Sequence, residues 1–344
     1  MICALRVTAQ ILKNHFRRGY SHMQVQKNGA MRGQPHHDIL RITGLVTRID
    51  ADGDPVHELQ LSCWCMTYTA FATITCQIDS NVLLQHFSLV YVIGYRTGED
   101  TNPILTLTYI GKPTTDQVMR LPCLHSLPRS LSPLPDVSDQ LVSAVNNLQT
   151  FQLRHFLKFS LERSDRLECF MLLPASQRDH HAYPGGLMTH SLEVAQMVVG
   201  MIRLNEPNMP LVWQETGFVA GLLHDLGKIR VYRRGGFQQP TASLVDHDQL
   251  TLELCAHGLE YLDQNLPDIA DTLRHVWTCA SPGARYGKTA MTTLARYLRD
   301  ADGQNAMADK QKRASRNYSL NGMRSINQQR FWLPGDEAIA YEAA

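Results

Sequence analysis

The 344-residue sequence lacks a strong charge of either sign, because 33 Lys and Arg residues stand against 32 Asp and Glu residues and leave a formal net charge of +1. A balance of this kind argues against a surface that binds nucleic acid over its whole extent, so any such contact must be local. Hydrophobic residues make up 44% of the chain and charged residues 19%. This composition excludes wholesale disorder and indicates a globular protein.

The chain also lacks the roughly 20-residue apolar run that a membrane-spanning helix needs. Its start has no signal-peptide core with a small-residue cleavage site. We therefore expect a cytoplasmic protein with no membrane partner.

The eight cysteines do not form the paired CxxC motifs of structural zinc sites, so they are expected to be reduced thiols. Cys63 and Cys65 are the one close pair. On a strand their spacing places both sulfurs on one face.

Residues 1–37 contain basic side chains and no acidic one before Asp38. This bias predicts a basic N-terminal arm. Two alternatives are an organelle-targeting segment and a native chain that starts at Met23, without residues 1–22. We favour the basic arm and the later start.

Residues 38–111 are rich in β-branched and aromatic side chains in five short runs separated by turn signals such as "DADGDP". The runs are 39–49, 57–66, 70–78, 89–95 and 103–111. A short apolar segment, 81–87, lies where a five-stranded OB barrel often carries a helix. We therefore expect an N-terminal all-β, OB-like barrel.

Aromatic side chains in these strands are candidates for stacking on unpaired bases. The candidate nucleic-acid-binding residues are Trp64, Tyr68, Phe71 and Tyr91. The alternative is that they form the core of the barrel.

The period of the apolar residues then changes along the chain. Residues 112–135 are rich in Pro and Ser and predict an extended linker. From 136 to 310 the apolar period is about 3.6, which predicts an all-α domain. Residues 311–344 carry clustered basic residues with little periodicity and predict a mobile basic tail.

Four residues of this helical domain are candidate metal ligands. His190 lies on or beside an apolar stripe, and His224 and Asp225 end the apolar run "FVAGLLHDLGK". Asp302 ends "LARYLRDAD". Carboxylates facing a core are costly unless a cation or donors meet them. The alternative for the doublet is a helix end that Gly227 stops and Lys228 stabilises.

Two imidazoles and two carboxylates suit a divalent ion, namely Mn²⁺, Fe²⁺, Co²⁺, Ni²⁺, Mg²⁺ or Zn²⁺. Such an ion activates water and polarises a phosphoryl group. The expected cofactor is one divalent ion per site.

The order of His190, the His224-Asp225 doublet and Asp302 resembles the HD phosphohydrolase superfamily. "HHAYPGGLMTHSLEVA" and "GLLHDLGK" are most similar to the HD domain of TraI, the MOBH-type conjugative relaxase. The OB-plus-HD layout resembles 3′–5′ exoribonucleases of the YhaM type. Together the resemblances span about residues 39–310, and they are closest over 174–230 and around Asp302.

The resemblance implies roles for individual residues. His190, His224, Asp225 and Asp302 match the metal ligands, and Lys228 matches a lysine suited to hold a phosphate oxygen. His180 and His181 match a pair that could steady or protonate a phosphate or leaving group. Exposed loop histidines are the alternative for this pair.

The sequence departs from two-metal relatives because no adjacent His pair lies between the doublet and Asp302. His247, His257 and His275 are present there, but their register singles out none of them as a ligand. The departure favours one ion held by four ligands.

These features together predict a metal-dependent phosphodiesterase or nuclease acting on single-stranded nucleic acid, in conjugative DNA processing or in 3′–5′ exonuclease activity. One alternative is a nucleotide phosphohydrolase or cyclic-nucleotide phosphodiesterase. Another is a non-catalytic nucleic-acid-binding module in a mobile-element complex. The sequence identifies no protein partner.

Overall fold

The computed structural model describes residues 33–279, 287–315, 322–326 and 329–333. The chain forms two compact units. Among the described residues, the first contains 33–62 together with Thr67–Pro113, and the second contains Cys63–Met66 together with those from Thr114 onward. Most of the expected basic arm, residues 1–32, lies outside the described residues.

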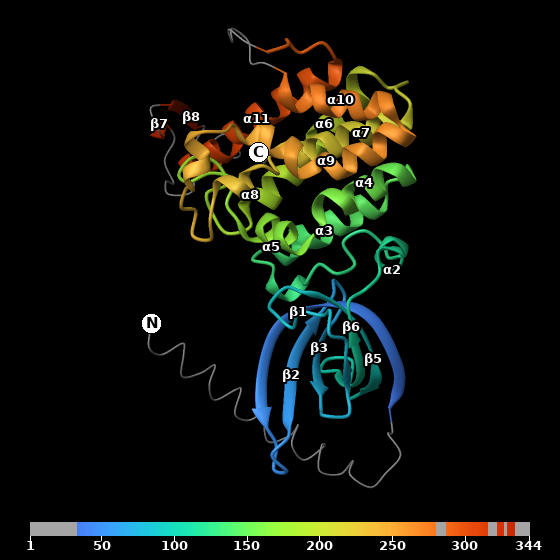
Figure 1. Cartoon of the computed structure of the whole chain (residues 1–344). Helices are drawn as coiled ribbons and strands as arrows, with labels where there is room; N and C mark the ends of the chain where they lie inside the picture. The colour runs from blue at the N-terminus through green and yellow to red at the C-terminus, as the bar shows by residue number, and fades with distance from the viewer. Residues whose placement is uncertain (1–32, 280–286, 316–321, 327–328, 334–344) are drawn as a thin grey trace, which may run out of the picture. The chain divides into compact units, whose positions relative to one another are not determined.

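The first unit is a small β-barrel (Figure 1). Its strands are β1 (Gln34–Ile49), β2 (Pro55–Ser62), β3 (Thr67–Ala72), β4 (Gln77–Ile78), β5 (Leu89–Thr97) and β6 (Ile104–Gly111). Strand β1 pairs with both β2 and β5, and a parallel pairing of β3 with β6 closes the sheet. This strand order is that of an OB barrel, which confirms the expected fold.

Buried and more exposed side chains alternate along the strands, and the buried ones form the core of the barrel. On β3, Tyr68, Ala70 and Ala72 are buried, whereas Thr69 and Phe71 between them are half-buried. On β5, Val90 and Val92 are buried and Tyr91 is half-buried. The period of two therefore divides the aromatic residues between the inner and outer faces.

One expected element of the barrel is absent. Residues 81–87, where a helix was expected, form turns without a helix. The backbone N–H of Val82 donates to the Asp79 carbonyl, and that of Gln85 donates to the Leu83 carbonyl. Leu83 is 68% exposed, so the apolar residues of the segment do not share one buried helical face.

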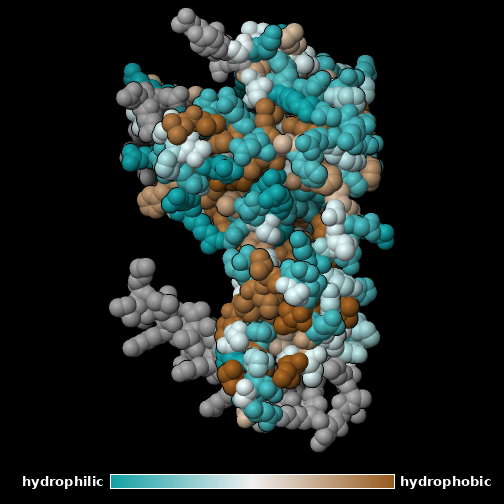
Figure 2. All heavy atoms as spheres, in the orientation of Figure 1, coloured by the Kyte–Doolittle hydropathy of each residue, from teal (hydrophilic) through white to brown (hydrophobic). Residues whose placement is uncertain are grey.

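The barrel exposes aliphatic side chains as well. Figure 2 shows hydrophobic residues on its surface. Those of the two long strands are Leu45, Val46 and Ile49 on β1 and Ile93 on β5. The outer face is therefore partly apolar.

The second unit is helical, as expected (Figure 1). Its α-helices are α2 (Thr115–Arg120), α3 (Pro135–Asn146), α4 (Phe151–Leu161), α5 (Ser164–Leu172), α6 (Gly186–Asn205), α7 (Leu211–Leu223), α8 (Lys228–Val231), α9 (His247–Asn265), α10 (Pro267–Thr278) and α11 (Thr293–Ser315). Two 3-10 helices, η2 (Arg129–Leu131) and η3 (Pro240–Ser243), and an antiparallel pair, β7 (Gly322–Ile326) and β8 (Gln329–Leu333), complete it.

Helix α6 lies at the centre of this unit and packs on α7 and α11, while α9 packs on α4 and α10. Eleven of the twenty residues of α6 are buried, including Met188, His190 and Val198. None of the described helices is long and apolar enough to cross a membrane.

The connections differ from the sequence-based expectations. Residues 112–135 are not an extended linker, because they contain α2 and η2 and pack on the second unit. The buried Lys158 side chain donates to the carbonyls of Val118 at 2.9 Å and Met119 at 3.2 Å. These bonds satisfy the C-terminal carbonyls of α2 and give the segment a fixed path.

The C-terminal end of the domain also differs. Asp302 was expected to end a helix, but it lies in the middle of α11, which continues to Ser315. Part of the tail expected to be mobile, residues 311–344, therefore belongs to α11, and β7 and β8 lie within it as well.

Substitutions at two glycines, one at the contact between α6 and α7 and one away from it, test how closely these helices pack. A Cβ added at Gly221 of α7 would lie 2.7 Å from the Ala195 Cα, whereas one added at the exposed Gly200 of α6 would meet nothing within 4 Å. Gly221→Ala should destabilise the helical unit by about 1–3 kcal/mol. Gly200→Ala should stabilise it by about 0.5–1 kcal/mol. Thermal unfolding followed by circular dichroism measures both, and equal effects would contradict the close packing.

Candidate metal centre

Three helices and the turn after one of them bring the four candidate ligands together. His190 lies in the second turn of α6, His224 and Asp225 follow the end of α7, and Asp302 lies on α11. His190 is fully buried, and Asp225 is 2% exposed. The Asp302 side chain is 46% exposed, so the cluster opens to solvent on that side.

Each histidine of the cluster approaches both carboxylates. His190 Nε2 lies 3.2 Å from Asp225 Oδ2, 3.2 Å from Asp302 Oδ1 and 3.3 Å from His224 Nε2. His224 Nε2 lies 3.5 Å from Asp225 Oδ2 and 3.7 Å from Asp302 Oδ1. Donor atoms about 2.1 Å from one ion lie about 3.0–3.4 Å from each other, so the separations among His190, His224 and Asp225 fit a shared divalent ion. Asp302 lies close to both histidines of this group.

The outer nitrogens of both histidines support this fit. His190 Nδ1 lies 2.8 Å from Asn305 Oδ1, and His224 Nδ1 lies 2.7 Å from the Gly221 carbonyl oxygen. Because both partners are acceptors, each Nδ1 donates its proton. Each Nε2 can then present a lone pair to an ion, as ligating histidines do.

Asp225 uses both of its oxygens. Oδ2 faces the cluster and accepts from Lys228 Nζ at 2.5 Å, and Oδ1 lies 3.1 Å from His247 Nε2. His247, near the start of α9, therefore fixes the plane of the carboxylate. His257 is exposed and packs edge-on against Phe159, and His275 Nε2 accepts from the Met291 N–H, so neither has a described contact with the cluster.

The charges around Asp225 keep it ionised. Burial raises its pKa, but the Lys228 ammonium and the His224 and His190 imidazoles outweigh burial and hold the pKa well below its usual range. Burial likewise opposes ionisation of Asp302, yet hydrogen bonds from His190 and His224 lower its pKa. Both carboxylates are thus negative near neutral pH.

His190 carries the compensating proton when no ion is bound. Burial lowers its pKa, but Asp225 and Asp302 raise it to about 9. A proton on Nε2 then occupies the position that a divalent ion would take. A proton and a metal ion thus compete for the same atom.

The two neighbouring histidines, His180 and His181, have different environments. A ring nitrogen of His180 lies within 4.8 Å of the ligand atoms of His190 and Asp302. His180 Nε2 is buried and has no hydrogen-bond partner among the described residues. Burial and the nearby His190 lower the pKa of His180 to about 4, so its ring is neutral near pH 7. His180 can therefore serve the cluster as a neutral donor or acceptor.

His181 lies behind the cluster and holds Asn305. Its ring is 3% exposed, with Nε2 2.9 Å from Asn305 Oδ1 and Nδ1 2.8 Å from the Tyr183 hydroxyl. Asn305 Nδ2 in turn donates to Glu193 Oε2 at 2.6 Å, which fixes the orientation of the amide. Both ring nitrogens of His181 are therefore engaged by side chains of the protein.

The turn after the doublet also differs from the helix-end alternative. Gly227 has φ −57° and ψ −21°, so it is not a left-handed helix stop. A Cβ at Gly227 would lie 1.9 Å from the His247 carbonyl oxygen. The glycine lets α9 approach closely enough for His247 to reach Asp225.

The four candidate nucleic-acid-binding aromatic residues do not form one surface. Tyr68 is 5% exposed in the barrel core, so its ring cannot stack on a base. Phe71 and Tyr91 lie on the outer face, where Tyr91 packs edge-on against Tyr109. Trp64 belongs to the second unit, and its indole N–H donates to Asp139 Oδ1 at 3.1 Å.

Sequence reasoning did not identify Asn305 and did not single out His247. The spacing of Asn305 three residues after Asp302 was a signal, because residues at i and i+3 share a helix face. For His247, a position at the start of a helix gave no indication that the side chain would contact Asp225.

Comparison with known protein families gives a match to part of the helical unit. A family model, TraI_2, with the description "Putative helicase", matches residues 141–234. This span includes His190, His224, Asp225 and Lys228 and supports a TraI-like domain here. No curated protein and no solved structure gives a significant match.

The proton on His190 predicts how the stability of the metal-free protein depends on pH. The folded-state pKa of about 9 lies above the ordinary 6.5. In metal-free protein, the protonated ring therefore stabilises the fold fully below pH 6.5, and this stabilisation is lost as the pH rises through about 9. The loss should be on the order of 3 kcal/mol.

Unfolding of metal-free protein at several pH values measures this loss, and His190→Gln should remove it. Titration of Mn²⁺ in two buffers of different ionisation enthalpy should show proton release. Metal binding without proton release would contradict the competition.

Asn305 should tune metal affinity without touching the ion. Asn305→Ala removes the acceptor that orients His190 and should weaken Mn²⁺ or Zn²⁺ binding by about 10–100-fold. Gln304→Ala, at an exposed neighbour on α11, is the matched control and should leave affinity unchanged. Competition with a chelating dye measures both, and equal affinities for the two variants would remove the role of Asn305.

Proposed function

We propose that the protein is a metal-dependent phosphohydrolase that cleaves phosphodiester bonds in single-stranded nucleic acid. The observation that carries the proposal is the approach of His190 and His224 to both Asp225 and Asp302 at 3.2–3.7 Å, with each histidine bonded to an acceptor through its outer nitrogen. A divalent ion bound there would activate water and polarise a phosphoryl oxygen.

The surrounding residues have separate roles in this proposal. Lys228 Nζ, 13% exposed and bonded to Asp225, holds the carboxylate and supplies positive charge toward a phosphate oxygen. Neutral His180 presents Nε2 to the reacting phosphate or to the attacking water. Substrate approaches at Asp302, the most exposed of the four ligands.

Two features favour nucleic acid over free nucleotides. The match to a family described as a putative helicase supports a function related to nucleic acid. The OB barrel is a fold that binds unpaired strands, and Phe71 and Tyr91 on its outer face are candidates for stacking.

The test uses purified full-length protein reloaded with Mn²⁺ and labelled single-stranded DNA, single-stranded RNA and free nucleotides. We expect cleavage of an oligonucleotide, and a loss of at least about 10²-fold in Asp225→Asn and His224→Ala. His257→Ala is the control, because His257 is an exposed histidine on α9.

The outcomes separate the alternatives. Turnover that survives both ligand substitutions would remove the catalytic assignment. Turnover of nucleotides alone would identify a nucleotide phosphohydrolase. Strand binding without turnover at any metal loading would identify a binding module.

A further inference from the structure

A second group of metal-ligating side chains lies in the second unit, apart from the HD-like cluster. Cys63 and Cys65 flank Trp64 in the turn that joins β2 to β3, and His125 lies in the segment between α2 and η2. We propose that Cys63, Cys65 and His125 bind a thiophilic divalent ion of the Zn²⁺ class. This site is independent of the proposed phosphohydrolase activity.

The turn presents the two sulfurs together. The Cys63 N–H donates to the Met66 carbonyl at 2.9 Å, which closes the turn, and the Cys63 and Cys65 Sγ atoms lie 3.4 Å apart. Two thiolates on a tetrahedral Zn²⁺ lie about 3.8 Å apart. The sulfurs therefore need to separate by only a few tenths of an ångström to share an ion.

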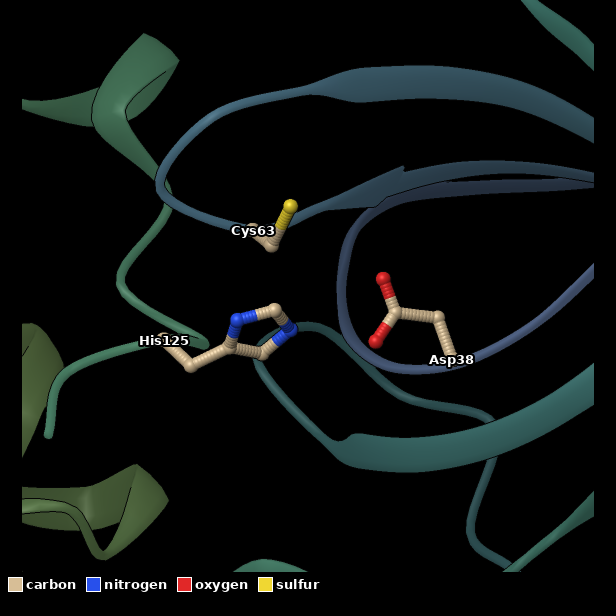
Figure 3. Close-up of side chains that lie close together, drawn as sticks. All are labelled: Asp38, Cys63 and His125. Carbon is tan, nitrogen blue, oxygen red and sulfur yellow. The ribbon is translucent and has the colours of Figure 1, made fainter. Parts of the chain in front are cut away.

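His125 supplies the third donor. Figure 3 shows its imidazole beside Cys63, and a ring nitrogen lies within 4.8 Å of the Cys63 sulfur. Cys63 is thus the donor close to both others, and the exposed Cys65 side chain has to turn toward His125 for all three to bind one ion. The Trp64 N–H donates to the His125 carbonyl at 2.9 Å. This bond ties the cysteine turn directly to the residue that carries the imidazole.

The segment around His125 is itself held in place. Asn146 bonds both backbone groups of Cys123 at 2.9 Å, and the Leu124 N–H donates to Glu162 Oε1 at 2.6 Å. On the other side of the turn, the Trp64 indole and the Arg129 guanidinium both donate to Asp139. Both halves of the site are thus ordered by bonds that do not involve the donor atoms.

The donor set determines which ion the site prefers. Two thiolates and one imidazole are softer than the imidazoles and carboxylates around Asp225, so they favour Zn²⁺ and Co²⁺ over Mn²⁺ and Mg²⁺. Cys63 is buried, whereas Cys65 is exposed, so an ion would enter from the Cys65 side. Binding would fasten the turn at Trp64 to the segment before α3.

Cobalt distinguishes this site from the HD-like cluster, because only thiolate ligands give a sulfur-to-cobalt charge-transfer band. Full-length protein is reduced, stripped of metal and titrated with Co²⁺. We expect the band to reach its full intensity when one Co²⁺ is bound per site, and to vanish when Zn²⁺ is added. The band should be lost in Cys63→Ser and in Cys65→Ser. His125→Ala should weaken Co²⁺ binding by at least about 10-fold.

Two controls make the result specific. Cys169→Ser, at a half-buried free thiol on α5, should keep the band. Asp225→Asn should keep it as well, even though its Mn²⁺-dependent activity is lost. Absence of the band in unaltered protein, or a band that survives Cys65→Ser, overturns the proposal. Because Cys65 is exposed, its replacement leaves the fold intact and the result readable.

Discussion

The carboxylate of Asp225 is ionised and buried, so it needs charged or hydrogen-bonding partners. The packing at the centre of the helical unit depends on this requirement. A buried ion without partners is far more costly than a buried pair, and loss of one partner typically costs about 3–5 kcal/mol. Asp225 is met by His190 from α6, by Lys228 from α8 and by His247 from α9. Gly227 permits the close approach of α9 that brings His247 to Asp225, and Gly221 permits the close packing of α7 on α6, the helix that carries His190.

Much of this centre could be predicted from residue types and spacing. The apolar stripe of one helix placed His190 inward, and the cost of burying Asp225 and Asp302 required a cation or donors. In the structure, His190 and His224 each lie 3.2–3.7 Å from carboxylate oxygens of Asp225 and Asp302. The barrel was predictable for a similar reason, because its strands alternate with a period of two.

The rest depended on contacts between residues far apart in sequence. His181 and Tyr68 resemble exposed candidates in the sequence, yet the fold buries both and engages the ring nitrogens of His181 with Asn305 and Tyr183. Residues 112–135 have the composition of a linker, but tertiary bonds from Lys158 and Asn146 fold them onto the helical unit. Composition indicates only the local conformational preference of a segment. In residues 112–135, tertiary hydrogen bonds outweigh this preference.

One face of α11 adds residues to the candidate metal centre from outside the span that matches a known family. Asp302 contributes a donor oxygen, Asn305 orients His190, and Asp309 accepts the backbone N–H of His181 at 3.0 Å. These residues follow one another at i, i+3 and i+7, so one helix surface serves all three purposes. The matched residues 141–234 hold three of the four proposed ligands, and α11 carries the fourth. Because Asn305 couples His190 to His181, any change in the position of α11 alters the ligand geometry and its hydrogen-bond support together.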